Sequence, residues 1–227
     1  MPELPEVETV IRGISSSILG QTIDKCVLSL KKLRYPITRN FKKNILSTKV
    51  ISISRRAKYI LINLSNNKTI IIHLGMSGRI ILTSNNENSK FKHTHMTLYF
   101  KNNLIAKFID PRRFGCILLF DTKAIVENRL FSHLGPEPLS KQFNPNYLER
   151  SCQNKKASIK SVIMNQSIVV GIGNIYASES LFRSGINPKR IAFDITYDQC
   201  VQLVKNIKLV LNRAIKLGGS SINDYSM

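Results

Sequence analysis

The chain has 227 residues, 43% of them hydrophobic, which suits one large domain or two ordinary ones and excludes a disordered chain. Its 34 Lys and Arg residues against 14 Asp and Glu residues give a formal net charge of +20. Such an excess predicts a polyanionic partner, most often nucleic acid, although mutational bias toward lysine would also raise the charge.

The sequence carries no signal for export or for a membrane span. No apolar run approaches the ~18 residues of a spanning helix, and the N-terminus lacks a basic region followed by an apolar stretch. The four cysteines lie far apart without a CxxC pair, which argues against a zinc site and a disulfide framework. We expect a cytoplasmic protein.

The first half of the chain predicts one helix followed by strands. Residues 5–19 have Pro5 and two acidic residues in the first turn, then apolar residues at helical spacing. Short β-branched and aromatic runs then predict strands at residues 22–30, 49–55, 59–64, 69–74, 95–100, 104–109 and 116–120. Their hairpin-like spacing indicates an antiparallel sandwich or barrel, and residues 84–90 predict a mobile loop.

The pattern changes near residue 130. "HLGPEPLS" is a Pro/Gly connector, and helical periodicity follows at residues 145–152, 155–166, 174–184 and 196–217. We therefore predict an α+β protein. An N-terminal helix and an antiparallel β-sandwich form residues 1–130, and a helical domain forms residues 131–227.

The opening "MPELPEVET" raises a chemical possibility. Removal of Met1 would leave Pro2 as a secondary amine, and an α-amino group has a pKa of about 8, so part of it is unprotonated at neutral pH. Amines attack carbonyl carbons to form Schiff bases, and a secondary amine gives a cationic iminium. Glu3 lies beside it as a candidate proton carrier. A simple helix start explains Pro5 but leaves Pro2 and Glu3 unexplained.

A set of collinear motifs strengthens this interpretation. "MPELPEVETV", "RRAKYILI", "IIHLGMSGR", "DPRRFG", "HLGPEPL", "VVGIGNIYASESLF" and "GINP" occur in this order along essentially the whole chain. In this the chain resembles the formamidopyrimidine-DNA glycosylase family, bacterial enzymes that excise oxidised purines such as 8-oxoguanine from duplex DNA. The combination of "HLGMSG" and "DPRRFG" favours this branch over the related endonuclease VIII branch.

The resemblance implies a catalytic group. By this resemblance we expect Pro2 to be the nucleophile on C1′ of the damaged nucleotide, Glu3 to carry protons, and Lys58 to be the acid–base group for strand cleavage by elimination. From the residues alone, Lys58 between Arg56 and a strand also fits a phosphate-binding lysine.

The resemblance also implies a DNA-binding group. Excision requires flipping the nucleotide out of the duplex, which leaves a gap and an unpaired partner base. Met76 and Phe114 match the family's wedge positions, and Arg112 matches the residue that reads the orphaned cytosine. An isolated Met or Phe is more often a core residue, but both lie next to glycine and polar turn residues, which favours loop tips.

The segment 155–182 resembles the family's helix–two-turn–helix element. Gly171 and Gly173 permit a tight turn, and the amides there with Asn174 at a helix start are candidates for holding a phosphate. Lys155 and His93 match further DNA-contact positions. Lys155 also fits an ordinary solvated lysine, and His93 in "HTH" is at most half a metal site.

The chain departs from the family at its end. Family members continue into a four-cysteine zinc finger, so we expect no cofactor here and no zinc site. The resemblance implies a bacterial, nucleoid-associated monomer that binds double-stranded DNA containing oxidised purines. Two functions stay open: a bifunctional glycosylase and lyase acting through a Pro2 Schiff base, followed by β(,δ)-elimination, or a non-catalytic DNA-binding remnant.

Overall fold

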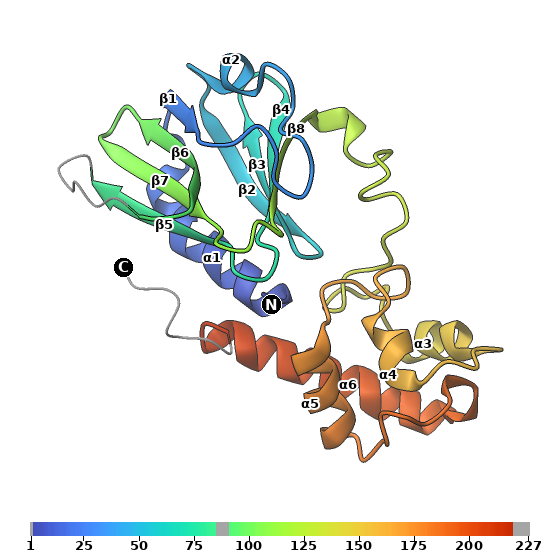
Figure 1. Ribbon diagram of the computed structural model, residues 1–227. Coiled ribbons are helices and arrows are strands. Elements are labelled where there is room, and N and C mark those ends of the chain that lie inside the picture. Colours follow the sequence, from blue (N-terminus) through green and yellow to red (C-terminus); the bar gives the residue numbers. More distant parts are fainter. Residues whose placement is uncertain (1, 85–90, 220–227) are drawn as a thin grey trace. The chain divides into compact units, whose positions relative to one another are not determined.

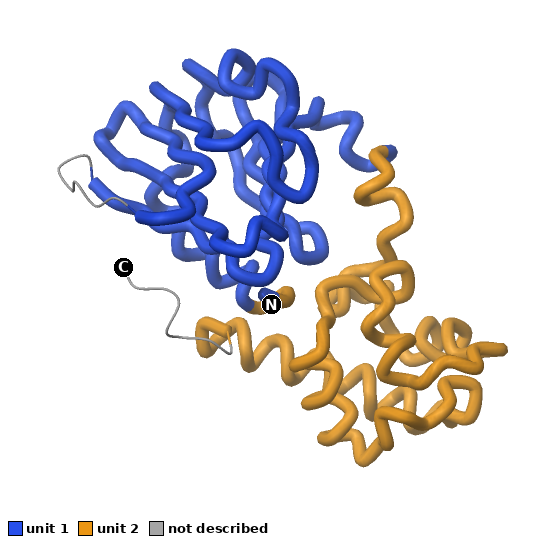
Figure 2. Tube along the Cα trace, in the orientation of Figure 1, with its two compact units in different colours: residues 1–2, 6–127, 221–227 blue, residues 3–5, 128–220 orange. Residues whose placement is uncertain are grey.

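The computed structural model describes residues 2–84 and 91–219. These residues form two compact units, shown in different colours in Figure 2. The first contains Pro2 and residues 6–127, and the second contains Glu3–Pro5 and residues 128–219. Most of the loop predicted at residues 84–90 lies outside the described residues, as does the segment from residue 220 onward.

The first unit contains two antiparallel four-stranded sheets, which confirms the predicted sandwich. The sheets have the orders β1-β6-β7-β5 and β2-β3-β4-β8 (Figure 1). The strands are β1 (Ile23–Leu28), β2 (Val50–Arg56), β3 (Tyr59–Leu64), β4 (Lys68–His73), β5 (Arg79–Ser84), β6 (Thr94–Phe100), β7 (Leu104–Ile109) and β8 (Cys116–Asp121).

Helix α1 (Leu4–Ile18) completes the hydrophobic core of this unit. Its apolar residues recur at helical spacing, and Val7, Val10, Ile11, Ile14 and Ile18 are buried in one cluster with side chains from both sheets. Figure 1 shows the helix running along the sandwich. The helix predicted over residues 5–19 is thus confirmed within one residue at each end.

Three elements of this unit were not predicted. Strand β5 begins just after the turn that contains Gly75 and Gly78, and most of its side chains are half-buried because it is an edge strand. It therefore lacks a clear alternation of buried and exposed positions. Helix α2 (Phe41–Ile45) is too short to show helical periodicity, and Asn40 enters it with a positive φ of 60°. A short 3₁₀ helix, η1 (Thr122–Ala124), follows β8.

The second unit is helical, with α3 (Pro145–Cys152), α4 (Ile159–Met164), α5 (Asn174–Arg183), α6 (Tyr197–Lys216) and the 3₁₀ helix η2 (Ala192–Asp194) around a separate core. Side chains of Asn144, Ser158 and Thr196 cap α3, α4 and α6. The predicted helix 155–166 was too long, because Ser158 is the N-cap and Ala157 instead accepts a hydrogen bond from the Ala192 amide (2.9 Å). Within the described ranges, no helix is both long and apolar enough to span a bilayer.

Candidate active site and nucleic-acid interface

Glu3 is bound at the N-terminus of helix α5. Its side chain is buried, with the residue 2% exposed. Oε2 accepts hydrogen bonds from the amides of Gly173 (2.7 Å) and Tyr176 (3.4 Å), and Oε1 accepts one from Ile175 (2.9 Å). The first amides of a helix have no partner within it and carry partial positive charge, so they stabilise a carboxylate. The same contacts fix the position of the chain one peptide bond from Pro2.

The two glycines of "VVGIGN" make room for this contact. Gly171 has a φ of +81°, and its carbonyl accepts a hydrogen bond from the Leu4 amide (3.0 Å). A Cβ at Gly171 would lie 2.7 Å from the Leu4 side chain, and one at Gly173 would lie 2.5 Å from Cδ of Glu3. These glycines therefore allow residues 3 and 4 to approach the start of α5. Asn174 is exposed at the first residue of that helix.

The amides near Gly173 have a different partner from the one we expected. Those of Gly173, Ile175 and Tyr176 bind the Glu3 carboxylate. A phosphate bound at this turn would therefore have to share these amides with the Glu3 carboxylate.

Lys58 lies in the hairpin turn between β2 and β3, where Arg56 pairs with Tyr59. The preceding Ala57 is buried in the left-handed region, with φ +53°, and its carbonyl accepts a hydrogen bond from Nη1 of Arg55 (3.0 Å). Nε of Arg55 also pairs with Oε2 of Glu8 on α1 (3.0 Å). Lys58 is only 8% exposed, so it is not the freely solvated surface lysine that a basic run would suggest.

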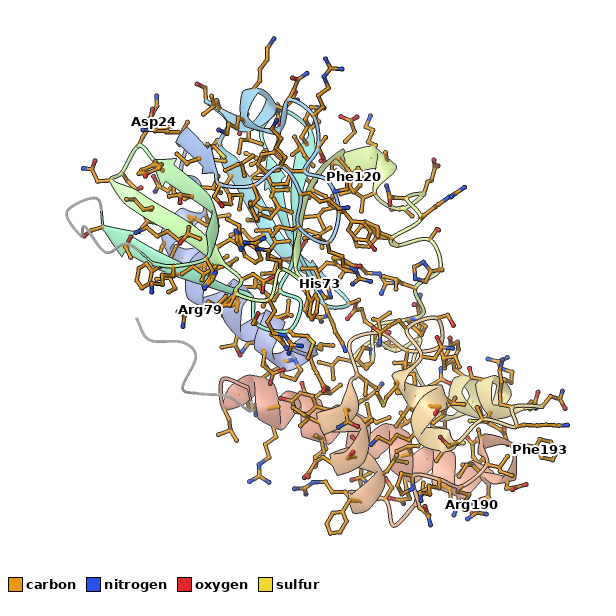
Figure 3. The ribbon with its side chains drawn as sticks, viewed as in Figure 1. Asp24, His73, Arg79, Phe120, Arg190 and Phe193 are labelled. Carbon is orange, nitrogen blue, oxygen red and sulfur yellow. The ribbon has the colours of Figure 1, made fainter. Side chains whose placement is uncertain are left out.

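His73 belongs to the neighbourhood of Lys58, and sequence reasoning missed it. Figure 3 labels it at the end of β4. Its Nδ1 accepts a hydrogen bond from the Gly75 amide (2.9 Å), and its ring centroid lies 4.9 Å from that of Tyr59. Burial, and then the positive charges of Arg34 and Lys58, lower the pKa of His73 to about 4. The ring is therefore neutral at physiological pH, with Nε2 as its proton-bearing nitrogen.

Met76, Arg112 and Phe114 lie in two adjoining loops of the first unit. Met76 is 42% exposed between β4 and β5, and Phe114 is 47% exposed between β7 and β8, so neither is a core residue. The Arg112 guanidinium lies 5.0 Å from the centre of the Phe114 ring. A Cβ on Gly75 would come within 2.5 Å of the backbone at Phe114 and Gly115, so the two loops touch where Gly75 lies.

The two histidines of "HTH" have different environments. His93 is exposed just before β6, with a φ of 62°. His95 is buried, and its ring nitrogens contact the Asp110 carbonyl (2.9 Å) and Oγ of Ser29 (3.2 Å). Both ring nitrogens of His95 therefore already have polar partners. In residues 2–84 and 91–219, no three His, Cys, Asp or Glu side chains gather as metal ligands would.

Lys155 is exposed in the second unit, just after α3. Its amide donates to the Cys152 carbonyl (3.1 Å), and its carbonyl accepts from the Phe193 amide (3.2 Å), so its backbone is held in place. Figure 3 shows Phe193 and Arg190 projecting from the segment between α5 and α6.

Unusual backbone conformations accompany several of these residues. Among the described residues, Ala57, His93 and Arg113 have a positive φ. The other non-glycine residues with a positive φ are Ser47 and four asparagines, a residue type that tolerates this conformation. Ala57 precedes Lys58, and Arg113 separates Arg112 from Phe114. Such conformations cluster at functional sites, which favours a role for these turns.

The chain was compared with known proteins. The family model described as the formamidopyrimidine-DNA glycosylase N-terminal domain matches residues 1–117, and the model of that family's H2TH domain matches residues 134–226. Formamidopyrimidine-DNA glycosylase of Klebsiella pneumoniae is 45% identical over 225 residues, which are 99% of this chain and 82% of the relative. That of Wolbachia pipientis is 44% identical over 227 residues, again 82% of the relative.

Solved structures give the same result. The complex of Lactococcus lactis Fpg with an abasic site containing DNA has a TM-score of 0.91 at 31% identity, covering 99% of this chain and 82% of that one. The complex of Lactococcus lactis Fpg with a Fapy-dG containing DNA has a TM-score of 0.90 at 31% identity, covering 98% and 83%. With the two family models spanning nearly all its length, the chain belongs to the formamidopyrimidine-DNA glycosylase family, the DNA glycosylases of base-excision repair.

Proposed function

We propose that this glycosylase is bifunctional: it removes oxidised purines from duplex DNA through a Schiff base on Pro2 and then cleaves the strand. The observation that carries the proposal is the anchoring of Glu3 by the amides of Gly173, Ile175 and Tyr176. This contact holds a carboxylate directly beside the residue that becomes the N-terminus when Met1 is removed. The family's structures with abasic and Fapy-dG DNA support the choice of substrate.

The chemistry uses the amine twice. The lone pair of the Pro2 nitrogen attacks C1′, the bond from C1′ to the base breaks, and the departing base takes up the proton that the Pro2 nitrogen loses. Opening of the sugar ring then moves the C1′–O4′ electrons onto O4′, which is protonated, and leaves an iminium between C1′ and Pro2. The iminium acidifies the C2′ proton. Its removal expels the 3′ phosphate by β-elimination.

Glu3 and Lys58 have separate roles in this scheme. Glu3, held at the start of α5 by the amides of Gly173, Ile175 and Tyr176, carries the O4′ proton. Lys58, 8% exposed in its turn, acts as the acid–base group for elimination. His73 lies near Lys58. Because its ring is neutral at physiological pH, it adds no second positive charge there.

The DNA contacts divide between phosphates and bases. Lys155, His93 and Asn174 are exposed, as phosphate contacts must be. Met76 and Phe114 fill the gap left by the flipped nucleotide, and Arg112 reads the orphaned base through its fork of donors. The partner is double-stranded DNA, and the protein acts as a monomer in the cytoplasm. The steps proposed above use side chains and the N-terminal amine, and none of them is assigned to a metal ion.

Product analysis tests the proposal. A duplex with a single 8-oxoguanine opposite cytosine, labelled at its 5′ end, is incubated with the chain lacking Met1. We expect release of the free base and a shortened labelled fragment, both strongly reduced in Pro2→Gly, which keeps a terminal amine but loses the secondary iminium and the rigidity of the ring. Binding without base release would instead support a non-catalytic remnant.

A further inference from the structure

One buried carboxylate connects the loops that carry Met76, Arg112 and Phe114. Asp110 directly follows β7 and is 0% exposed. Its Oδ1 accepts a hydrogen bond from the Ser77 hydroxyl (2.6 Å), and its Oδ2 accepts one from the Gly115 amide (2.7 Å). Ser77 lies beside Met76 in one loop, and Gly115 lies beside Phe114 in the other. We propose that Asp110, acting with Ser77, is a positioning residue that sets the discrimination of the base opposite the lesion.

The hydrogen bonds extend from Asp110 to the base-reading residue. Oγ of Ser77 donates to Asp110 and accepts a hydrogen bond from the backbone amide of Arg112 (3.1 Å). The Asp110 carbonyl also accepts one from the amide of Arg113 (3.3 Å), whose φ is +57°. The left-handed turn between Arg112 and Phe114 is thus held at its start by Asp110 and Ser77.

The glycines show how closely the loops fit. A Cβ on Gly115 would lie 2.7 Å from the His73 carbonyl oxygen and 3.0 Å from Oδ2 of Asp110. A Cβ on Gly78 would lie 2.1 Å from the Leu74 carbonyl oxygen, which itself accepts a hydrogen bond from the Gly78 amide (2.8 Å). The Gly78 turn is therefore tight within its own loop, and the close approach at Gly115 places the loop that carries Phe114 against the end of β4, where the loop that carries Met76 begins.

The other side of Asp110 is fixed to the sheet. Its amide donates to the His93 carbonyl (3.1 Å), and its carbonyl contacts Nε2 of His95 (2.9 Å). A carbonyl only accepts, so Nε2 of His95 is the donor in this contact, and Nδ1 lies 3.2 Å from Oγ of Ser29. Asp110 therefore joins the start of β6, where the exposed His93 lies, to the two loops.

The chemistry of the site favours positioning over simple packing. A buried carboxylate is unfavourable unless hydrogen bonds satisfy it, and an apolar side chain would fill this space at lower cost. Both carboxylate oxygens of Asp110 instead accept hydrogen bonds, one from each of the two loops. Placement of this precision matters for Arg112, because a bidentate base contact depends on orientation and distinguishes bases by about 5- to 150-fold.

The inference rests on the proposed function, since it assumes that Arg112 reads the base opposite the lesion. Its test measures binding alone, so that it stays informative if the chain proves inactive. Duplexes carry a tetrahydrofuran abasic analogue opposite cytosine or opposite adenine. The ratio of the two dissociation constants is measured for the unmodified chain, for Ser77→Ala, for Asp110→Asn and for the control Asp121→Asn, whose exposed carboxylate pairs with Lys68 (2.8 Å).

We expect the unmodified chain and Asp121→Asn to prefer cytosine by at least fivefold. Ser77→Ala and Asp110→Asn should reduce this ratio at least threefold, while affinity for undamaged duplex changes less than twofold. Ser77→Ala removes one hydroxyl from a half-buried position, so it answers the question even if Asp110→Asn fails to fold. An unchanged ratio in folded Ser77→Ala would overturn the proposal, as would an unmodified chain with no preference. Failure of the proposed function appears separately, as absent base release.

Discussion

Replacement of Glu3 should destabilise the second unit as well as stop catalysis. Glu3→Ala removes the acceptor of three amide hydrogen bonds, at 2.7, 2.9 and 3.4 Å, and leaves the buried amides of Gly173 and Tyr176 without this partner. Hydrogen bonds to a charged group contribute about 1.5–3 kcal/mol each. These values are not additive, and water can reach the partly exposed Ile175. We therefore expect a loss of about 3–5 kcal/mol in the free energy of unfolding.

The matched control is Glu179→Ala, on the helix α5 whose first amides bind Glu3. Oε1 of Glu179 pairs with Nε of Arg183 at 2.6 Å, but both side chains are well exposed, at 44% and 37%. An exposed pair of this spacing contributes about 0.3–0.5 kcal/mol. Glu3→Ala thus removes a buried carboxylate bound at the N-terminus of α5, and Glu179→Ala removes an exposed one on the helix surface, with expected costs that differ about tenfold.

Urea unfolding followed by circular dichroism at 222 nm measures both variants, because the second unit supplies helices α3 to α6. Glu3→Gln should lie between them, since its amide keeps one acceptor oxygen but turns N–H donors toward the amides of α5. Its effect on base excision must therefore be assayed below its unfolding transition. If Glu3→Ala costs no more than Glu179→Ala, Glu3 does not anchor α5 and this account of the site is wrong.

Further predictions concern single groups. Lys155→Ala should weaken binding to every duplex sequence and reduce the slope of log affinity against log salt by about one, measured by anisotropy between 50 and 200 mM salt; an unchanged slope would remove Lys155 from the phosphate contacts. Because the Pro2 iminium itself acidifies the C2′ proton, elimination at a preformed abasic site can proceed without Lys58, so Lys58→Ala should impair 8-oxoguanine excision more than abasic-site cleavage in parallel single-turnover assays; equal losses would contradict this. The pKa of His73, lowered to about 4, lies below its unfolded value near 6.5, so its neutral ring contributes stability that is complete above pH ~6.5 and lost toward pH 4. The shift is worth about 3 kcal/mol, and unfolding of His73→Gln across this range should lack that part of the slope. Burial raises the pKa of Cys26 and of Cys116 to about 11, and all four cysteines are buried, so native protein should not react with a disulfide reagent until urea unfolds it.

The fold was predictable where local pattern and tertiary environment agree. Strands β3 and β4 are short β-branched runs, and the helical spacing of Val7 to Ile18 matches a helix with one buried face. Prediction was wrong where tertiary contacts decide the outcome. Residues 155–157 are not helical, because the Ala157 carbonyl accepts a hydrogen bond from the amide of Ala192, about 35 residues away. No property of residues 155–157 indicates that contact.

The site was predictable as motifs but not as contacts. "HLGMSG" and "DPRRFG" pointed to Met76, Arg112 and Phe114, and their exposure agrees with loop positions. The partnership of Ser77 with Asp110 joins residues 33 positions apart, and that of Glu3 with Gly173 joins residues 170 positions apart, so no local pattern contains either. His73 lies inside a motif, yet its neutral state depends on Arg34 and Lys58, which only the fold brings near it.

The central claim is that the opening stretch supplies the nucleophile, and borohydride trapping tests it most directly. The chain is prepared with Pro2 as its free N-terminus and, in parallel, with Met1 and a tag retained, and both are mixed with an abasic duplex and borohydride. Reduction of the iminium should link the free form covalently to DNA and leave the blocked form unlinked, while both bind a tetrahydrofuran duplex. Equal yields of the covalent adduct from the two forms would show that another amine attacks C1′.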